Sequence, residues 1–235
     1  MQFKRFELKY FLNPVDTESL SQRLQAVLET DTYVKQEDGY RVRSLYFDSF
    51  DDECLYQKQS GLMIRKKIRL RTYGESQGDT IKFEIKHKQG AMVLKEAAVI
   101  DQNMAKQVCQ GNWDVLLKPG HPVLNKIYAL ASTRLYCPKV IVEYIRMAYL
   151  FPAFNIRITF DKQLHSNINH LDLFSDQYDA MPTILEGKEI MEVKYEDYMP
   201  VFISRLLTSV PTQRSAISKY TLARRFHKHQ KWEDN

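Results

Sequence analysis

The segment Met63–Tyr73 alternates with a period of two, and this alternation constrains the fold more than any other feature of the chain. One set of alternate positions is basic throughout, namely Arg65, Lys67, Arg69 and Arg71. The positions between them include the apolar residues Ile64, Ile68 and Leu70. Because successive side chains of a β-strand point to opposite faces of a sheet, the segment is predicted to be a strand with four cations on one face.

The same alternation recurs along the chain. The segment Thr80–Lys88 has apolar residues at one set of positions and charged residues at the other, which are Lys82, Glu84, Lys86 and Lys88. Further strand-like segments carry charged or polar residues at alternate positions, which are Arg5, Glu7 and Lys9, then Arg146, then Arg157, Thr159 and Asp161, then Glu192 and Lys194. The sequence therefore predicts several strands that share one chemical pattern.

Two interpretations fit such charged faces. An antiparallel sheet with one face toward water also alternates, and for a single strand this is the simpler explanation. A water-facing strand, however, mixes signs and tolerates Ser, Thr, Asn and Gln, whereas these strands carry Arg or Lys at nearly every pleat. Like charges on adjacent strands repel, and a bound polyanion would convert that repulsion into affinity. A closed or strongly curved sheet would direct the cations at one ligand.

Helical patterns separate the strands into groups. Strands are expected at Lys4–Leu12, Tyr40–Asp48, Met63–Tyr73, Thr80–Lys88, Val93–Ile100, Lys139–Tyr149, Asn155–Asp161 and Glu189–Tyr195. Helices are expected at Asp16–Thr30, at about 103–135 with a break at Pro119, and at 200–230 with a break at Pro211. The pattern predicts an α+β fold, and because no repeat or linker is visible we expect one domain over residues 1–235.

Composition excludes several classes of protein. The chain has 235 residues, 44% of them hydrophobic, with eight Gly and eight Pro, so it can bury a core and is no low-complexity chain. Its formal charge of +5 is too small to imply a polyanionic partner by itself. The three cysteines form no C-x-x-C pair, and neither a signal peptide nor a run of 18 apolar residues is visible. We therefore expect a cytoplasmic protein.

Eight short motifs, taken in order, resemble a known family. They are RFELKY at 5–10, SLYFD at 44–48, KIRLRTYG at 67–74, FEIK at 83–86, VEYIR at 142–146, RITFD at 157–161, EVK at 192–194 and SKY at 218–220. Together they resemble the polyphosphate polymerase domain of the vacuolar transporter chaperone complex, one of the triphosphate tunnel metalloenzymes. The resemblance implies a closed antiparallel β-barrel, the triphosphate tunnel, with a charged lumen and flanking helices.

The resemblance also implies functional residues. The phosphate-binding cations of the catalytic site would be Lys9, Arg69, Arg71, Lys86, Arg146 and Lys219. Further ligand contacts are expected from Arg5, Arg65, Lys67, Lys88, Arg157, Lys194 and Ser218. A divalent metal, Mn²⁺ or Mg²⁺, would be held by Glu192, with Glu7 and Glu84 as weaker candidates. Other branches of the superfamily begin with Glu-x-Glu-x-Lys, and Arg5 at the first of these positions favours the polymerase branch.

The implied activity is that of a polyphosphate polymerase, which transfers the γ-phosphoryl group of ATP or another triphosphate onto phosphate or polyphosphate. Two alternatives stay open. One is a triphosphatase that hydrolyses tripolyphosphate or a nucleoside triphosphate. The other is a module that binds polyphosphate or nucleotide without turnover, associated with a membrane through a separately encoded membrane protein. No nucleic-acid partner is expected, because the cations alternate along strands instead of lining a recognition helix. The strand tyrosines Tyr10, Tyr46 and Tyr144 are interpreted as wall aromatics.

Overall fold

A computed structural model describes residues 5–34, 38–74, 80–90, 92–175 and 183–233. The chain divides into two compact units. Unit 1 consists of Met1–Arg41, Tyr144–Leu164 and Thr183–Ser218, and unit 2 consists of Val42–Glu143, His165–Pro182 and Lys219–Asn235. Each unit is described by itself below. The expectation of a single domain over residues 1–235 stays a prediction.

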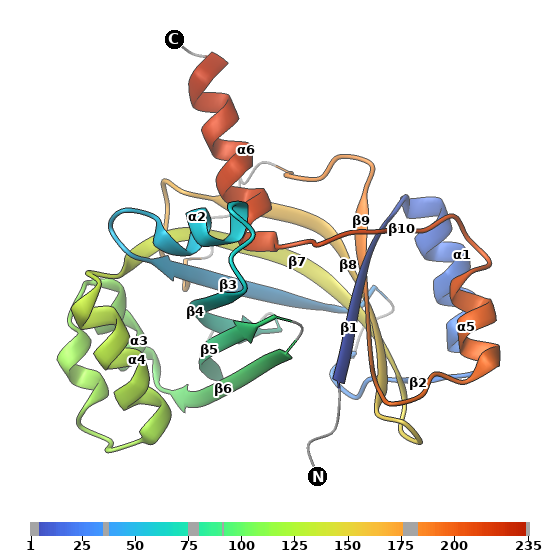
Figure 1. The fold of residues 1–235 in the computed structure, drawn as a ribbon, viewed down its shortest axis with the longest axis horizontal. Coiled ribbons are helices and arrows are strands. Elements are labelled where there is room, and N and C mark those ends of the chain that lie inside the picture. Colours follow the sequence, from blue (N-terminus) through green and yellow to red (C-terminus); the bar gives the residue numbers. More distant parts are fainter. Residues whose placement is uncertain (1–4, 35–37, 75–79, 91, 176–182, 234–235) are drawn as a thin grey trace. The chain divides into compact units, whose positions relative to one another are not determined.

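Unit 1 is built on antiparallel strands that pair in the order β10, β1, β9, β8 and β7. Their bounds are β10 Gln213–Arg214, β1 Arg5–Leu12, β9 Glu189–Glu196, β8 Ile156–Asn167 and β7 Cys137–Phe151, and the two-residue strand β2, Glu29–Thr30, also pairs with β7. Two helices belong to this unit, α1 Pro14–Gln25 and α5 Val201–Leu207, and they lie side by side (Figure 1).

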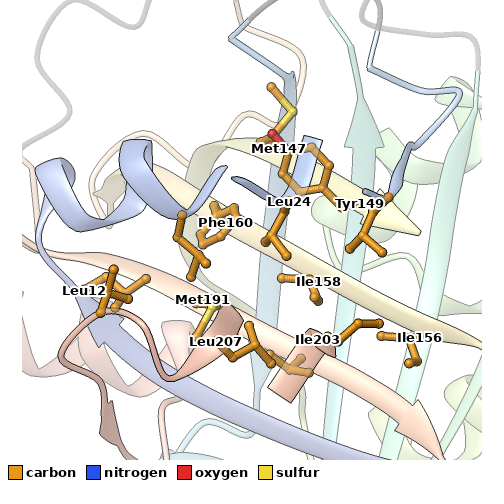
Figure 2. Close-up of a cluster of buried hydrophobic side chains, with 14 residues drawn as sticks. Leu12, Leu24, Met147, Tyr149, Ile156, Ile158, Phe160, Met191, Ile203 and Leu207 are labelled. Atoms are coloured by element: carbon orange, nitrogen blue, oxygen red, sulfur yellow. The ribbon is translucent and has the colours of Figure 1, made fainter. Parts of the chain in front are cut away.

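The apolar face of the unit 1 sheet packs against these helices. Alternate residues of β8 and β9, such as Ile158 and Val193, are fully buried, and Leu24 of α1 and Ile203 of α5 lie against them (Figure 2). Helix α1 begins at Pro14, two residues before the expected Asp16, because Pro14 suits the first helical position and the Asn13 side chain accepts a hydrogen bond from the Asp16 amide. The charged alternate positions therefore lie on the other face of the sheet.

The strands of unit 2 pair in the order β7, β3, β4, β5 and β6, and the long strand β7 has residues in both units. The additional strands are β3 Tyr40–Asp48, β4 Ile64–Tyr73, β5 Ile81–Gln89 and β6 Met92–Ile100. The helices are α2 Glu53–Gln59, α3 Gln102–Cys109, the 3₁₀ turn η1 Trp113–Leu116, α4 Pro122–Thr133 and α6 Lys219–Glu233. Figure 1 shows α3 and α4 next to each other, after the chain leaves β6.

The core of unit 2 lies on one face of β3, β4 and β5. The rings of Phe47, Phe83 and Trp113 contact one another, with centroids 5.4 to 6.3 Å apart. Ile68 and Leu70 of β4 are fully buried on the same face. Aromatic and branched apolar residues at alternate positions thus fix this face as the inner one, and the basic positions of β4 and β5 point to the opposite face.

The expected strands are confirmed, and the α+β class with them. The expected helix Asp16–Thr30 ends earlier, at Gln25, and the chain then forms β2. Helix α2 and strand β10 were not expected from the sequence. No helix among the described residues has the length and apolar character needed to cross a membrane.

The expected closed barrel is corrected to an open sheet. The order of paired strands has two ends in the described residues, β10 and β6. The physical reason lies at the first end, where β10 contributes only Gln213 and Arg214 to the ladder before the chain leaves the sheet. Closure requires an edge strand that offers a row of backbone donors and acceptors, and a two-residue strand does not provide one.

Candidate functional site

One face of β4, β5 and β6 in unit 2 gathers positive charge. Its eight Lys and Arg residues are Arg65, Lys67, Arg69, Arg71, Lys82, Lys86, Lys88 and Lys95. In the strand register Lys67 lies beside Lys86, which lies beside Lys95, so three ammonium-bearing side chains are neighbours across three strands. In the described parts of these strands, Glu84 is the single carboxylate on this face. Such an arrangement, here called the cation face, is repulsive without an anion.

Glu84 lies among the cations and is 1% exposed. Its Oε2 atom accepts hydrogen bonds from Nε and Nη2 of Arg69, both at 2.7 Å. Its Oε1 atom accepts one from Nζ of Lys95 at 2.9 Å. Burial opposes ionisation, but the charges of Arg69 and Arg71 hold the pKa of Glu84 far below its usual value. Glu84 is therefore a carboxylate counter-ion that orients Arg69.

Strand β3 supports the two arginines from the other side. The Arg69 Nη1 group donates to the Tyr46 hydroxyl at 3.1 Å, and the Arg71 Nε group donates to the Ser44 hydroxyl at 2.9 Å. The register explains both contacts, because Tyr46 faces Arg69 and Ser44 faces Arg71. The two guanidinium groups are thus held by neighbouring strands, as a site for phosphate oxygens requires.

The start of helix α6 joins this region of unit 2. The Tyr220 hydroxyl donates to Oδ2 of Asp48 at 2.5 Å, and Nζ of Lys67 lies 5.5 Å from the Tyr220 ring centroid. Asp48 also accepts from the amides of Ser49 and Cys54 at 2.8 Å and of Leu55 at 3.1 Å. One buried carboxylate therefore ties the end of β3 to the starts of α2 and α6.

Unit 1 has a second charged face, of mixed sign. Across β1, β9 and β8, Lys9 lies beside Glu192, and Glu7 lies beside Lys194, which lies beside Arg157. The Lys9 Nζ atom is 3.0 Å from Oε1 of Glu7 and 3.5 Å from Oε2 of Glu192. Lys194 forms an ion pair with the other oxygen of Glu192.

Two arginines of unit 1 are held by acidic partners. Arg146 donates from Nε and Nη2 to the two carboxylate oxygens of Asp161, at 2.6 and 2.8 Å. Although burial acts against it, Asp161 raises the pKa of Arg146, so this guanidinium stays charged. Arg157 donates to Asp31 at 2.7 Å and to the Tyr40 hydroxyl at 3.1 Å. The sequence analysis missed Asp31, which follows β2 and belongs to no alternating pattern.

The structure thus places the expected site residues in two sets. Unit 2 brings together Arg65, Lys67, Arg69, Arg71, Glu84, Lys86 and Lys88, with Lys219 at the start of α6. Unit 1 brings together Glu7, Lys9, Arg146, Arg157, Glu192 and Lys194 on its charged face, with Ser218 directly before α6. Arg5 pairs with Glu196 in the β1–β9 ladder, and its side chain lies outside the described part. Besides Asp31 in unit 1, three contributors in unit 2 were not expected as site residues: Ser44, Tyr46 and Lys95.

The expected metal ligands were tested against their surroundings. Both oxygens of Glu84 contact cationic side chains, and so do both oxygens of Glu192. Glu7 contacts the ammonium group of Lys9. Across the described residues, no group of three His, Cys, Asp or Glu side chains could hold a metal ion. As they lie, these three carboxylates bind cationic side chains and do not form a divalent-metal site. The expected Mn²⁺ or Mg²⁺ ion stays a prediction.

Comparison with solved structures defines the fold. A candidate adenylyl cyclase from Hippeastrum, HpAC1, described as having a dominant triphosphatase activity, has 12% identity and a TM-score of 0.55 over 95% of each chain. A candidate adenylate cyclase from Bacillus halodurans has 17% identity and a TM-score of 0.51 over 89% of this chain and 95% of that one. PH1819 from Pyrococcus horikoshii OT3 has 12% identity and a TM-score of 0.50 over 93% and 97%. At these identities the likeness shows the fold alone.

The sequence profile of the VTC domain matches residues 4–227. The chain therefore belongs to the VTC domain family, and the resemblance found in the eight motifs is confirmed. A search of curated proteins found no match.

Proposed function

We propose that this protein is a polyphosphate polymerase, which transfers the terminal phosphoryl group of ATP, or of a similar triphosphate, onto phosphate or polyphosphate. The observation that carries the proposal is the cation face of unit 2, where eight Lys and Arg side chains share one face with the single carboxylate Glu84 in the described strands. A chain of phosphoryl groups is the kind of ligand that offers regularly spaced anionic oxygens to such a surface.

The comparisons support this choice at a coarser level. Membership of the VTC domain family agrees with a protein that handles phosphate chains. The dominant triphosphatase activity described for HpAC1 shows that a protein of this fold acts on triphosphates. Both comparisons agree with transfer to phosphate and with transfer to water, and an assay of the products identifies the acceptor.

The proposed reaction needs no nucleophile from the protein. An oxygen of the acceptor phosphate attacks the terminal phosphorus of the donor, the bond from that phosphorus to its bridging oxygen breaks, and the nucleoside diphosphate leaves. Negative charge spreads over the transferred group, so positioned cations supply most of the stabilisation. Arg69 and Arg71 bind phosphate oxygens in this proposal, because Glu84 and Ser44 hold their guanidinium groups in place.

The lysines act as point charges along the phosphate chain. Lys67 and Lys86 lie beside each other on β4 and β5, with Lys219 at the start of α6. The charged face of unit 1, with Lys9, Lys194 and Arg146, is considered by itself, and these three residues stay predicted phosphate ligands. A divalent ion, when bound, would neutralise part of the phosphate charge.

The test is to incubate the protein with ATP and Mn²⁺ or Mg²⁺ and to size the products. Chains longer than tripolyphosphate, formed together with ADP in equal amounts to the phosphoryl groups incorporated, are the expected result. Free phosphate without chains would identify a triphosphatase and contradict the polymerase. Binding of tripolyphosphate without any product at any metal concentration would identify a binding module.

A further inference from the structure

Tyr46 is the one aromatic side chain of β3 that contacts both an arginine of the cation face and the start of α6. It is 5% exposed, and its ring centroid is 5.5 Å from that of Tyr220. Its hydroxyl oxygen accepts a hydrogen bond from Arg69 Nη1 at 3.1 Å. The sequence pattern predicts a wall aromatic here, but a wall aromatic does not require its oxygen to face a guanidinium group.

The cations that act on Tyr46 come from two elements of unit 2. From β4, Arg69 and Arg71 act on it, and from α6, Lys219 does. The buried carboxylates of this region have partners of their own, because Glu84 on β5 binds Arg69 and Lys95, and Asp48 on β3 accepts from the Tyr220 hydroxyl. Arg69 is thus shared between Glu84 and the Tyr46 hydroxyl. The Tyr46 oxygen therefore lies in a buried position, hydrogen-bonded to Arg69 and within the electrostatic influence of Arg71 and Lys219.

Such surroundings favour the negatively charged form of a phenol. Burial by itself raises the pKa of Tyr46, but Arg69, Arg71 and Lys219 together lower it to about 7. An anion bound to the same arginines would cancel part of their field at the Tyr46 oxygen, and the phenol would then retain its proton to higher pH.

We propose that Tyr46 is a positioning residue of the phosphate site, and that its hydroxyl releases a proton to solvent when the site is empty and takes one up when phosphate oxygens bind Arg69 and Arg71. The phenolate then serves as a replaceable counter-ion: together with Glu84, it offsets part of the charge of the two arginines while no substrate is present. This inference rests on the proposed function, because it requires that phosphate chains bind at the cation face.

The proposal predicts that binding of a phosphate chain becomes weaker as the pH rises, because binding is coupled to proton uptake by Tyr46. Below the pKa of the empty site Tyr46 is protonated in both states, and binding involves no proton at this residue. Above it, binding must re-protonate Tyr46, so the dissociation constant rises with pH, by up to about tenfold for each pH unit. The variant Tyr46→Phe keeps the ring against Tyr220 but has no proton to exchange, so its affinity should not follow this profile.

The experiment is isothermal titration calorimetry of tripolyphosphate at pH 6.5, 7.5 and 8.5, in buffers of different ionisation enthalpy. Wild type is compared with Tyr46→Phe and with Tyr128→Phe, which removes a hydroxyl from α4. Because the ligand's own protons are common to all three proteins, the difference between variants isolates Tyr46. At pH 8.5 we expect wild type and Tyr128→Phe to take up about one proton more than Tyr46→Phe, and to lose at least about tenfold more affinity from pH 6.5 to 8.5.

A second measurement does not depend on a folded variant. The ultraviolet absorbance of tyrosinate at 295 nm is recorded against pH in wild type, with and without tripolyphosphate. A phenol that ionises near neutral pH in the unliganded protein and at higher pH in the complex supports the inference.

The outcomes separate the two proposals. If tripolyphosphate binds but proton uptake and pH profile are the same in wild type and Tyr46→Phe, the inference about Tyr46 is wrong and the phosphate site stands. If tripolyphosphate does not bind at all, both fail. If it binds with the expected linkage but no phosphoryl transfer occurs, the Tyr46 assignment holds and the polymerase assignment fails.

Discussion

At the scale of single residues, Arg71 is the best probe of the proposed chemistry. Its side chain is anchored by Ser44, a neutral residue, and it is 5% exposed. Removing it leaves no buried carboxylate without a partner in the described contacts. The variant Arg71→Ala should therefore fold and lose phosphoryl transfer by about 100-fold or more, since one preorganised donor to a transition-state oxygen is commonly worth that factor.

The matched control for Arg71→Ala is Lys118→Ala, which changes the net charge equally at an exposed position between η1 and α4. Rates of ATP consumption and chain formation are measured for both. Wild-type turnover in Arg71→Ala, or an equal loss in Lys118→Ala, would contradict the assignment of Arg71 to the site.

Arg69 is a less suitable probe than Arg71, because it is ion-paired with the buried carboxylate of Glu84. The resemblance gives Arg69 and Arg71 the same expected role. The variant Arg69→Ala, however, would leave the buried Glu84 with Lys95 as its remaining described ion-pair partner. Breaking a buried ion pair from one side costs about 3 kcal/mol. We expect this loss in chemical denaturation of Arg69→Ala, and partial recovery in the double variant Arg69→Ala/Glu84→Gln. Equal stability of the two variants would show that the pair is not coupled.

The stabilisation that the ion pair of Glu84 and Arg69 contributes should weaken as the pH falls. The pKa of Glu84 is lowered in the folded protein by Arg69 and Arg71, against the effect of burial. Its contribution to the free energy of unfolding is therefore fully present at neutral pH and is lost as the pH falls below the ordinary carboxyl range. Between pH 7 and pH 3, wild type should lose more stability than Glu84→Gln, as urea titrations at each pH would measure.

At the scale of elements, the alternation of apolar and charged residues predicts most strands closely. Strand β3 has the expected bounds, β4 differs from expectation by one residue at its start, and β5 differs by one residue at each end. Strand β8 runs on to Asn167, well past the expected end at Asp161, because the positive φ of 50° at Gln163 interrupts the alternation without ending the strand. A period-two pattern cannot show a strand that continues through such a residue.

Helix α2 shows a different limit of local pattern. Its N-cap residue Asp52 has a positive φ and makes no capping bond with its side chain. The Glu53 amide instead donates to the Ser49 hydroxyl, and the amides of Cys54 and Leu55 donate to Asp48 on β3. Because the capping group belongs to another element, no local start signal marks this helix.

The same Asp48 leads to a prediction about helix α6. Tyr220→Phe removes the hydrogen bond to Asp48 while keeping the ring, so the free energy of unfolding should fall by about 1 to 2 kcal/mol. Tyr56→Phe on α2, where the ring is half exposed, is the control and should change it by less than about 0.5 kcal/mol. Hydrogen exchange of the α6 amides should accelerate in Tyr220→Phe alone. Unchanged exchange would mean that Asp48 does not hold the start of this helix.

At the scale of the whole molecule, the sequence could predict the family, the α+β class and which residues share a strand face. It could not predict ion-pair partners such as Glu84 with Arg69, or Arg157 with Asp31, because these depend on register between strands and on segments far apart in the chain. Nor could it predict that the sheet stays open, which depends on the two-residue edge strand β10. Binding measurements with tripolyphosphate test the expected roles of the charged residues.

Charge at the level of the whole chain leads to the last prediction. The formal net charge of +5 is modest, so affinity for a phosphate chain should come from the local cation face and not from general attraction. Tripolyphosphate at about 100 times its dissociation constant should stabilise the fold by about 2.7 kcal/mol and raise the melting temperature by about 5 to 10 °C. This shift should shrink as sodium chloride is added. Lys86→Gln should reduce it, whereas Lys118→Gln, with the same net charge, should leave it intact. Equal shifts in the two variants, measured by differential scanning fluorimetry, would indicate non-specific attraction and contradict a local site.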